Sequence, residues 1–201
     1  AVFTRPGGER IARYACELAR SRPRRHLTIV TKSNAQRHCM VFWDEVCRDV
    51  IRDYPDLAVD WMLVDAMTQR MVLKPATIDT VLATNLHADI LSDLAAALAG
   101  SLGIGATANI DPERRRPSMF EPIHGSAFDI TRKGVANPLG SFWTATMMLD
   151  HLGEAQAARR LMSAIETVTA RRETLSPDLG GTATTDEVTR AVIDALRGAN
   201  A

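Results

Sequence analysis

Short strand-like segments alternate with amphipathic helical segments over the first hundred residues, and this alternation limits the chain to few folds. The strand-like segments are rich in β-branched residues, as in His26–Thr31, whereas the helical segments repeat apolar residues every three or four positions. This pattern predicts strands at 26–31, 59–64 and 80–84, and helices at 7–21, 40–53, 66–73 and 88–98. Such alternation predicts an α/β fold built of layered helices and strands.

The character of the chain changes after Gly100. Glycine and proline residues punctuate a long connection from there to about Gly140, and long loops inside compact domains tend to be functional. Three further helices are predicted beyond it, at 139–152, 154–172 and 186–196. A domain boundary is therefore expected near Gly100, dividing the chain into residues 1–99 and 100–201.

The balance of charges gives no reason to expect nucleic acid or a membrane as a partner. Lysine plus arginine and aspartate plus glutamate each number 24, so the formal net charge is zero. No apolar run approaches the ~20 residues that span a bilayer, and the first residues lack the apolar core of a signal peptide. The three cysteines form no CxxC pair, which suits a reducing compartment. We therefore expect a cytoplasmic protein.

Three carboxylates stand where predicted strands give way to helices. Asp89 and Asp93 are four residues apart and so project from one face of a helix, where like charges repel unless a cation lies between them. Hard oxygen ligands of this kind suit Mg²⁺ or Mn²⁺. Asp65 follows the preceding strand in the same way, at the end where α/β sheets bind ligands. The alternatives are dipole-favoured acids in a first helical turn for the pair, and a helix N-cap for Asp65.

A lysine follows the first predicted strand. Lys32 comes directly after the strand 26–31. A lysine held beside a divalent cation gives up its proton more readily and serves as a general base. The alternative is a solvated surface lysine. For a single lysine in a loop, considered without other evidence, this alternative is favoured.

The turn-rich connection contains a second candidate site. The small residues Gly125, Ser126 and Ala127 let the backbone approach a ligand closely, and their N–H groups suit a pyrophosphate. Asp129 is suited to accept hydrogen bonds from ribose hydroxyls, and Asn137 to donate and accept at an adenine edge. The chain has no GxGxxG motif, so a dinucleotide site here is expected to be of a type other than Rossmann.

Taken together, these segments resemble the isocitrate/isopropylmalate/tartrate family of metal-dependent β-decarboxylating dehydrogenases, over essentially the whole chain. The family signature Asn-x-x-Gly-Asp-Ile-Leu-Ser-Asp is similar to residues 85–93. The family's NAD-binding loop, His-Gly-Ser-Ala-Pro-Asp-Ile followed by Ala-Asn-Pro, is similar to residues 124–130 and 136–138. Three further stretches (2–5, 31–34 with 42–45, and 108–114) resemble the tartrate and D-malate dehydrogenases more than the isopropylmalate dehydrogenases.

The resemblance implies an isopropylmalate dehydrogenase-like two-domain fold, truncated at the N-terminus. Residues 1–99 would be the later part of the second domain, which holds the metal and the dimer interface, and 100–201 the C-terminal part of the NAD-binding first domain. Asp89 and Asp93 would bind Mg²⁺ or Mn²⁺ from one subunit, whereas Lys32 and Asp65 would reach the neighbouring subunit's site in an obligate homodimer. Lys32 would take the substrate's hydroxyl proton as hydride passes to NAD. The residues implied to bind NAD are His124, Gly125, Ser126, Ala127, Asp129 and Asn137.

The chain departs from the family pattern at three positions and in length. Ala88 stands at the family's glycine, His87 at its aromatic residue and Phe128 at its loop proline. His87 offers a further ligand, or it is a partly buried bystander. The family's N-terminal half, with its substrate-binding arginines and catalytic tyrosine, has no counterpart, and the chain begins with Ala1. We therefore expect a fragment that is inactive by itself.

The expected function of the full-length protein is NAD-dependent oxidative decarboxylation of a 2-hydroxy dicarboxylate, tartrate or D-malate, with a divalent metal. 3-Isopropylmalate and isocitrate stay open as alternative substrates, because the substrate-reading segment lies upstream of these residues. A non-catalytic remnant that keeps the dimer surface is the alternative from another class of protein.

Overall fold

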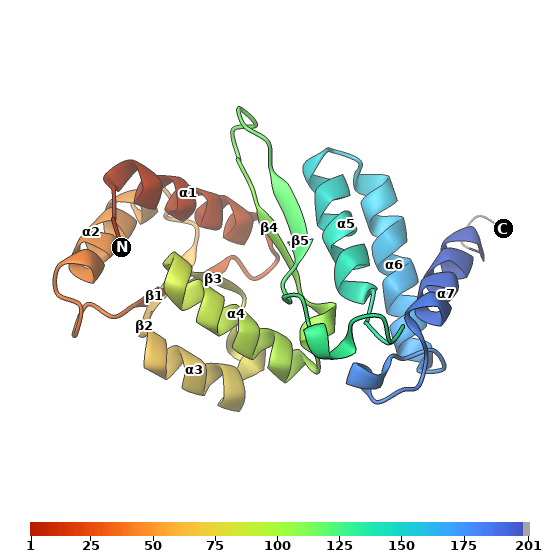
Figure 1. Cartoon of the computed structure of the whole chain (residues 1–201). Coiled ribbons are helices and arrows are strands. Elements are labelled where there is room, and N and C mark those ends of the chain that lie inside the picture. Colours follow the sequence, from red (N-terminus) through yellow and green to blue (C-terminus); the bar gives the residue numbers. More distant parts are fainter. Residues whose placement is uncertain (199–201) are drawn as a thin grey trace. The chain divides into compact units, whose positions relative to one another are not determined.

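The computed structural model describes residues 1–198, and the chain divides into two compact units between Ala95 and Ala96 (Figure 1). The architecture is mixed α/β, so the fold class predicted from the alternating segments is confirmed. None of the helices within residues 1–198 is long and apolar enough to cross a membrane.

A three-stranded parallel sheet in the order β2-β1-β3 forms the centre of the first unit. Helices α1 and α2 cover one face of this sheet, and helices α3 and α4 cover the other (Figure 1). The strands are β1 (His26–Thr31), β2 (Ala58–Leu63) and β3 (Thr80–Leu82). The helices are α1 (Arg5–Ser21), α2 (Cys39–Ile51), α3 (Val64–Leu73) and α4 (Asn85–Ala99).

Both faces of the central strand are buried because its side chains alternate. Leu27 and Ile29 of β1 point into the apolar core shared with α1 and α2. Val30 points the other way and packs with Met67 of α3 and Leu91 of α4. A parallel strand covered on both faces is expected to be apolar throughout, which accounts for the short β-branched run that marked this strand in the sequence.

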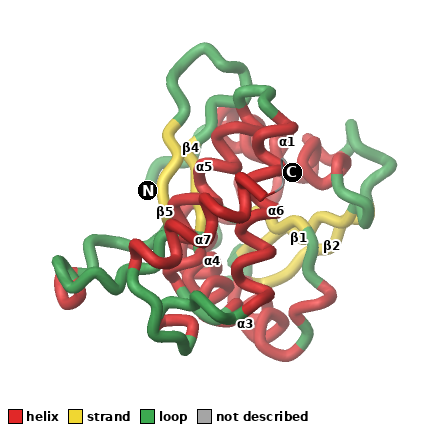
Figure 2. Tube along the Cα trace, turned by 90° about the vertical axis from the view of Figure 1, so that its right-hand side faces the viewer, coloured by secondary structure: helices red, strands yellow, loops and turns green. Residues whose placement is uncertain are grey.

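The second unit consists of a β-hairpin and three helices. The strands β4 (Ala106–Asn109) and β5 (Met119–Pro122) pair antiparallel, and α5 (Leu139–His151) packs against them. Helices α5, α6 (Ala155–Arg171) and α7 (Thr185–Gly198) share one apolar core. Figure 2 shows the strands in two groups, which are the parallel sheet and this hairpin. Short 3₁₀ helices lie at Pro75–Thr77, Leu102–Ile104, Phe128–Ile130 and Pro177–Leu179.

The helices and strands predicted from the sequence all occur, with ends that differ by no more than about three residues, as boundary effects allow. The largest shift concerns α4, which begins at Asn85 and not near Ala88. The hairpin was not predicted. Its strands are four residues long, and the first of them, Ala106–Asn109, consists of small and polar residues with no alternating apolar pattern.

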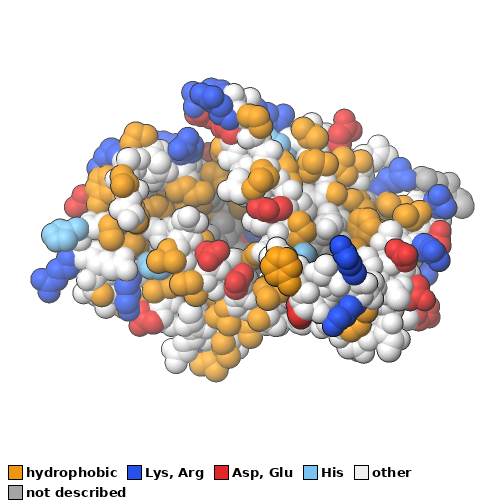
Figure 3. Space-filling view, viewed as in Figure 1, with side chains coloured by type: hydrophobic (Ala, Val, Ile, Leu, Met, Phe, Trp, Pro, Cys, Tyr) orange, Lys and Arg blue, Asp and Glu red, His pale blue; other side chains and the backbone are white. Residues whose placement is uncertain are grey.

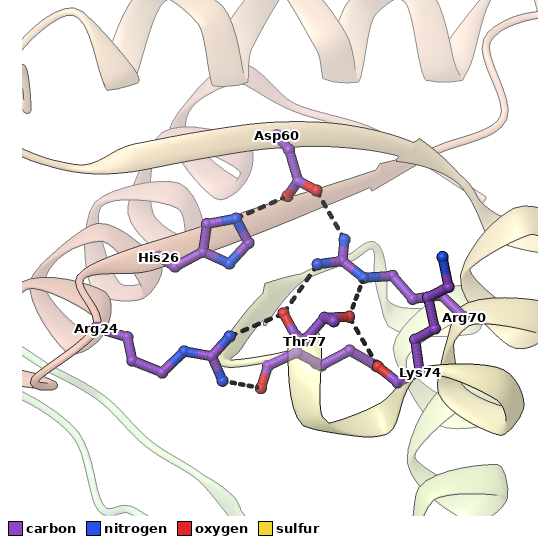
Figure 4. A network of polar contacts seen from close by, with 7 residues as sticks. Arg24, His26, Asp60, Arg70, Lys74 and Thr77 are labelled. Atoms are coloured by element: carbon purple, nitrogen blue, oxygen red, sulfur yellow. Dashed lines mark hydrogen bonds and ion pairs between the residues drawn. The ribbon is translucent and has the colours of Figure 1, made fainter.

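A polar network fixes the edge of the sheet where the strands begin (Figure 4). Arg70 of α3 donates to Asp60 of β2, with 2.7 Å between Nη1 and Oδ2, and also to the hydroxyl and carbonyl of Thr77. Arg24, which precedes β1, donates to three carbonyls of the turn around Thr77. These contacts fix α3 and the turn that leads into β3. The network takes no part in the opposite edge of the sheet, where the parallel strands end.

Candidate functional site

The carboxyl ends of the three parallel strands bring part of the predicted site together. Lys32 directly follows β1, and Asp65 lies in the first turn of α3, directly after β2. Because β1 and β2 are adjacent and in register to their last residues, the two side chains meet. The Nζ atom of Lys32 lies 2.5 Å from Oδ1 of Asp65. Strand ends of this kind are where α/β sheets place ligand-binding groups.

The Lys32–Asp65 pair is partly open to solvent. The side chain of Lys32 is 25% exposed and that of Asp65 is 66% exposed. The hydrogen bond from Lys32 lowers the pKa of the Asp65 carboxyl below its ordinary value. The alternative reading of Asp65 as a helix N-cap is wrong, because Leu63 is the N-cap residue of α3 and has no capping side chain. The carboxylate of Asp65 is turned to the lysine.

Helix α2 holds the end of β1 that precedes the lysine. The indole N–H of Trp43 donates to the carbonyl of Val30 at 3.1 Å. The hydroxyl of Thr31 donates to Oδ1 of the buried Asp44 at 2.5 Å and accepts from the N–H of Ser33 at 3.2 Å. The sequence analysis did not identify Asp44 as part of the site. The available signal was a carboxylate within the mainly apolar buried face of α2.

The other two predicted metal ligands lie one turn apart on α4. Asp89 and Asp93 are both exposed, and neither forms an ion pair within residues 1–198. Because α4 begins at Asn85, its first turn contains no acidic residue, so the helix-dipole alternative for this pair is wrong. Two unpaired carboxylates on one helical face are a donor set that fits a hard divalent cation.

Within a single chain, the structure does not gather the three predicted metal ligands. No group of three histidine, cysteine, aspartate or glutamate side chains in the described part of the chain is placed to hold a metal ion. Asp65 is paired with Lys32, apart from any such group. The assignment of Asp65, Asp89 and Asp93 to one metal ion therefore stays a prediction.

The histidine of the signature segment lies inside the first unit. His87 is 6% exposed, and its Nδ1 atom has no hydrogen-bond partner among residues 1–198. Burial lowers the pKa of this imidazole, and the charge of Lys32 lowers it further. The ring is therefore neutral near pH 7, and the structure places it as a buried residue close to the lysine.

The predicted NAD-binding loop is open to solvent from His124 to Asp129. A Cβ atom at Gly125 would meet nothing within 4 Å, and the backbone there is not left-handed, so the protein's own packing does not require this glycine. Ala127 has a φ of +43°, a left-handed conformation that costs a non-glycine residue free energy. The ring of Phe128 is 86% exposed. The small, exposed residues of this turn leave room for a ligand to approach the backbone closely, and the left-handed backbone at Ala127 is strained.

Asn137 is engaged inside the protein. Its Nδ2 donates to Asp178 at 2.9 Å, and its Oδ1 accepts from the N–H of Leu139 at 3.0 Å, at the start of α5. The residue is 9% exposed. The Oδ1 atom and one N–H of the side-chain amide are thus bonded within the protein, which favours the main chain of Asn137 for contact with an adenine edge. The sequence analysis did not identify Asp178, which lies about forty residues further along the chain.

Comparison with known proteins places the chain in a family. The family model for isocitrate/isopropylmalate dehydrogenase matches residues 1–192. The chain belongs to this family. The resemblance inferred from the motifs at 85–93 and 124–138 is thereby confirmed.

Curated relatives of this isocitrate/isopropylmalate dehydrogenase family member carry two related names. A probable tartrate dehydrogenase/decarboxylase of Agrobacterium vitis is 67% identical over 200 residues, which cover 100% of this chain and 56% of the relative. A D-malate dehydrogenase (decarboxylating) of Escherichia coli (strain K12) is 46% identical over 196 residues, covering 95% of this chain and 54% of the relative. The chain thus spans about half the length of these relatives.

Solved structures of the family share the fold. An isocitrate dehydrogenase of Methylococcus capsulatus superposes with a TM-score of 0.93 at 41% identity, over 98% of this chain and 58% of that one. A β-decarboxylating dehydrogenase of Thermococcus kodakarensis in its apo form superposes with a TM-score of 0.84 at 36% identity, over 98% and 57%. The expected isopropylmalate dehydrogenase-like fold is confirmed for the part that the chain covers.

Proposed function

We propose that the full-length protein containing these residues oxidatively decarboxylates tartrate or D-malate, with NAD as hydride acceptor and Mg²⁺ or Mn²⁺ as cofactor. The observation that carries the proposal is the Lys32–Asp65 pair at the ends of two parallel strands, in a family member whose relatives are named for these reactions. 3-Isopropylmalate and isocitrate are the competing substrates.

The charges of the first unit suit this chemistry. Asp89 and Asp93 would hold the divalent cation, which when bound supplies positive charge beside the substrate's hydroxyl and carboxylate. In its neutral amine form, which a nearby cation favours, Lys32 would accept the substrate's hydroxyl proton at Nζ. Bound NAD would serve as the acceptor of the hydride from the carbon that bears this hydroxyl, and the β-keto acid so formed would lose CO₂. Asp65, 2.5 Å from the lysine, stabilises the ammonium form that results.

The nucleotide would bind along the exposed loop of the second unit. The N–H groups of Gly125, Ser126 and Ala127 suit the pyrophosphate, beside His124. The carboxylate of Asp129 is exposed and suits ribose hydroxyls. Asn137 would contribute through its main chain, because its side chain is engaged.

We further propose a homodimer in which Lys32 and Asp65 complete the partner's site. Figure 3 shows apolar side chains exposed over α3 and α4 of the first unit. They include Leu73 at the end of α3, which is 67% exposed, and Leu86 and Ile90 of α4, which are 65% and 51% exposed. Leu86 and Ile90 lie one turn apart on the helix that carries Asp89 and Asp93. An apolar surface beside an incomplete metal site suits a second copy of the chain.

In this proposal residues 1–99 belong to the dimer-forming, metal-binding second domain and residues 100–201 to the NAD-binding first domain. The enzyme is proposed to be cytoplasmic. Residues 1–201 alone are proposed to be inactive, since the substrate-binding arginines and the tyrosine of the family pattern have no counterpart among them.

Turnover and metal binding test the proposal together. The protein encoded by the full reading frame is expected to produce NADH and CO₂ from tartrate or D-malate with Mn²⁺. Asp89→Asn should abolish this activity and weaken Mn²⁺ binding measured by titration calorimetry. The matched control is Asp194→Asn, which changes an exposed helical carboxylate of the second unit. Unchanged turnover in Asp89→Asn would refute the metal assignment.

Mixed dimers test the sharing of the site. Lys32→Ala and Asp89→Asn should each be inactive. Subunits of the two variants, unfolded and refolded together, should regain about a quarter of wild-type activity, because half of the dimers are mixed and each has one intact site of two. If both residues acted within one subunit, every site would carry a defect and the mixture would stay inactive.

A further inference from the structure

A carboxylate in the second unit is held by three neutral donors. Oδ2 of Asp178 accepts from the hydroxyl of Ser101 and from Nδ2 of Asn137, and its Oδ1 accepts from the hydroxyl of Ser176 at 2.5 Å. All three donor residues are buried. No lysine or arginine pairs with Asp178 in the part of the chain that the structure describes.

The packing around this carboxylate is close. A Cβ atom at Gly103 would lie 2.7 Å from Oδ2 of Asp178 and 2.9 Å from Cβ of Asn137, so glycine is required at this position. The N–H of Gly103 donates to the hydroxyl of Ser101 at 2.8 Å. Three segments that are distant in sequence therefore meet at one carboxylate, and each donor has a defined direction.

A second contact reaches the same loop from the start of α7. The hydroxyl of Thr185 donates to the carbonyl of Ala136 at 2.6 Å. Its N–H donates to the carbonyl of Gly134 at 2.8 Å. The segment 134–137 ends at Asn137, which the proposed function assigns to nucleotide binding. Asp178 holds this segment through the side chain of Asn137, and Thr185 holds it through the carbonyls of Gly134 and Ala136.

We propose that Asp178, assisted by Thr185, is a positioning residue for NAD. It does not touch the nucleotide itself. By accepting from Asn137 it fixes the loop main chain in the conformation that binds the dinucleotide, so that the affinity for NAD depends on a residue outside the binding loop. The inference rests on the proposed function only in taking the loop 124–137 as the nucleotide site.

The test measures NADH binding as well as turnover, with the full-length protein. Asp178→Ala leaves the amide of Asn137 without an acceptor. NADH binding, measured by fluorescence titration, should then weaken about tenfold, which corresponds to the loss of one charge-assisted hydrogen bond. The KM for the hydroxy acid should stay within about twofold, because its ligands lie in the first unit. Asp178→Asn should restore most of the affinity, since Oδ1 of the new amide accepts from Asn137 and its NH₂ group can donate to Ser176.

Two further variants separate positioning from general stability. Ser176→Ala removes a hydrogen bond from the same carboxylate without touching the loop, so it should lower the thermal midpoint and leave NADH binding unchanged. Thr185→Val removes the second hydroxyl contact at a partly exposed position, and should weaken NADH binding even if Asp178→Ala does not fold.

Several results would overturn the inference. One is unchanged NADH binding in both Asp178→Ala and Thr185→Val. Another is an equal fall of NADH binding in Ser176→Ala, and a third is a joint rise of the KM values for both substrates. A wild-type protein that binds no NADH would remove this inference along with the nucleotide site. A wild-type protein that binds NADH but oxidises no hydroxy acid would refute the proposed activity, whereas the binding measurements would still support or overturn the role of Asp178.

Discussion

Replacement of Thr31 by valine tests whether α2 fixes the strand end that carries Lys32. The substitution keeps the shape of the side chain and removes the hydroxyl. The hydrogen bond to Oδ1 of Asp44, 2.5 Å long, is then lost, and the N–H of Ser33 loses its acceptor. Asp44 is 4% exposed, and its remaining ion-pair partner is Arg48 at 3.7 Å.

The expected cost follows from these contacts. A hydrogen bond to a charged acceptor contributes roughly 1.5–3 kcal/mol, and a buried acceptor left without its donor retains the full desolvation penalty. Thr31 is itself 6% exposed, so water cannot readily replace the hydroxyl. We therefore expect Thr31→Val to lower the free energy of unfolding by about 2–3 kcal/mol.

Thr80→Val is the matched control. Thr80 lies on the adjacent strand β3 and is also 6% exposed, but its hydroxyl has no hydrogen-bond partner among residues 1–198. Removing a buried hydroxyl without a partner relieves a desolvation cost, so this variant should be neutral or about 1 kcal/mol more stable. The same chemical change on neighbouring strands is thus expected to have opposite effects.

Urea unfolding of the full-length variants measures the difference, with tryptophan fluorescence as the signal and midpoints compared at equal slope. Turnover supplies the second readout. Thr31→Val should also lower kcat, because the strand end before Lys32 loses its hydrogen bond to Asp44 and the N–H of Ser33 after it loses its acceptor. The account of how α2 holds this strand end is refuted if Thr31→Val lowers the free energy of unfolding no more than Thr80→Val does.

Other predictions concern single groups of the two units. Asp65→Asn should leave the urea midpoint unchanged, as exposed ion pairs contribute little, but lower kcat at least about tenfold if Asp65 supports the base. Burial raises the pKa of Asp178, but its three side-chain hydrogen bonds together lower it by more, so the pKa lies below its ordinary value. The stabilisation that this carboxylate contributes is therefore fully present above the unfolded-state pKa and is lost as pH falls through the lowered folded-state pKa, so Asp178→Asn should show a flatter stability profile in acid-unfolding experiments. Gly181→Ala should cost about 3 kcal/mol or more on denaturant unfolding, because the added Cβ would lie 1.9 Å from the carbonyl oxygen of Leu175. Ala127→Gly should stabilise by up to about 1 kcal/mol in the same assay, because it relieves a φ of +43°.

The elements of the first unit were predictable because local pattern and tertiary burial agree there. The apolar run of β1 reflects a strand covered on both faces, and each strand is followed by a helix with an apolar side. The position of Lys32 and Asp65 after strands then follows from topology. The boundary of α4 was less predictable, because Asn85 and Leu86 carry no strong signal for the first turn.

The groups that hold the candidate sites were not predictable from local sequence. Asp44 and Asp178 act through contacts with partners 13 and 41 residues away, and no spacing rule links such positions. The side chain of Asn137 shows a further reason why local sequence is insufficient. Its chemistry suits an adenine edge, but its Oδ1 and one N–H of its amide are bonded within the protein. Residue type alone shows what a side chain is able to bind, and only the packing shows whether its atoms are free.

In the proposed dimer, the metal site would depend on assembly because the acids are divided within one chain. Asp65 is paired with Lys32. Asp89 and Asp93 remain unpaired within residues 1–198, one turn apart, beside the exposed apolar side chains of Leu86 and Ile90. A cation bound to those two acids alone would keep open positions for a substrate and for a group from a second copy. If the mixed Lys32→Ala and Asp89→Asn dimers regain activity, dimer formation brings the proton acceptor to the metal, and the apolar surface over α3 and α4 is the interface that we propose for it. Stability of the dimer and activity would then fall together when that surface is disrupted.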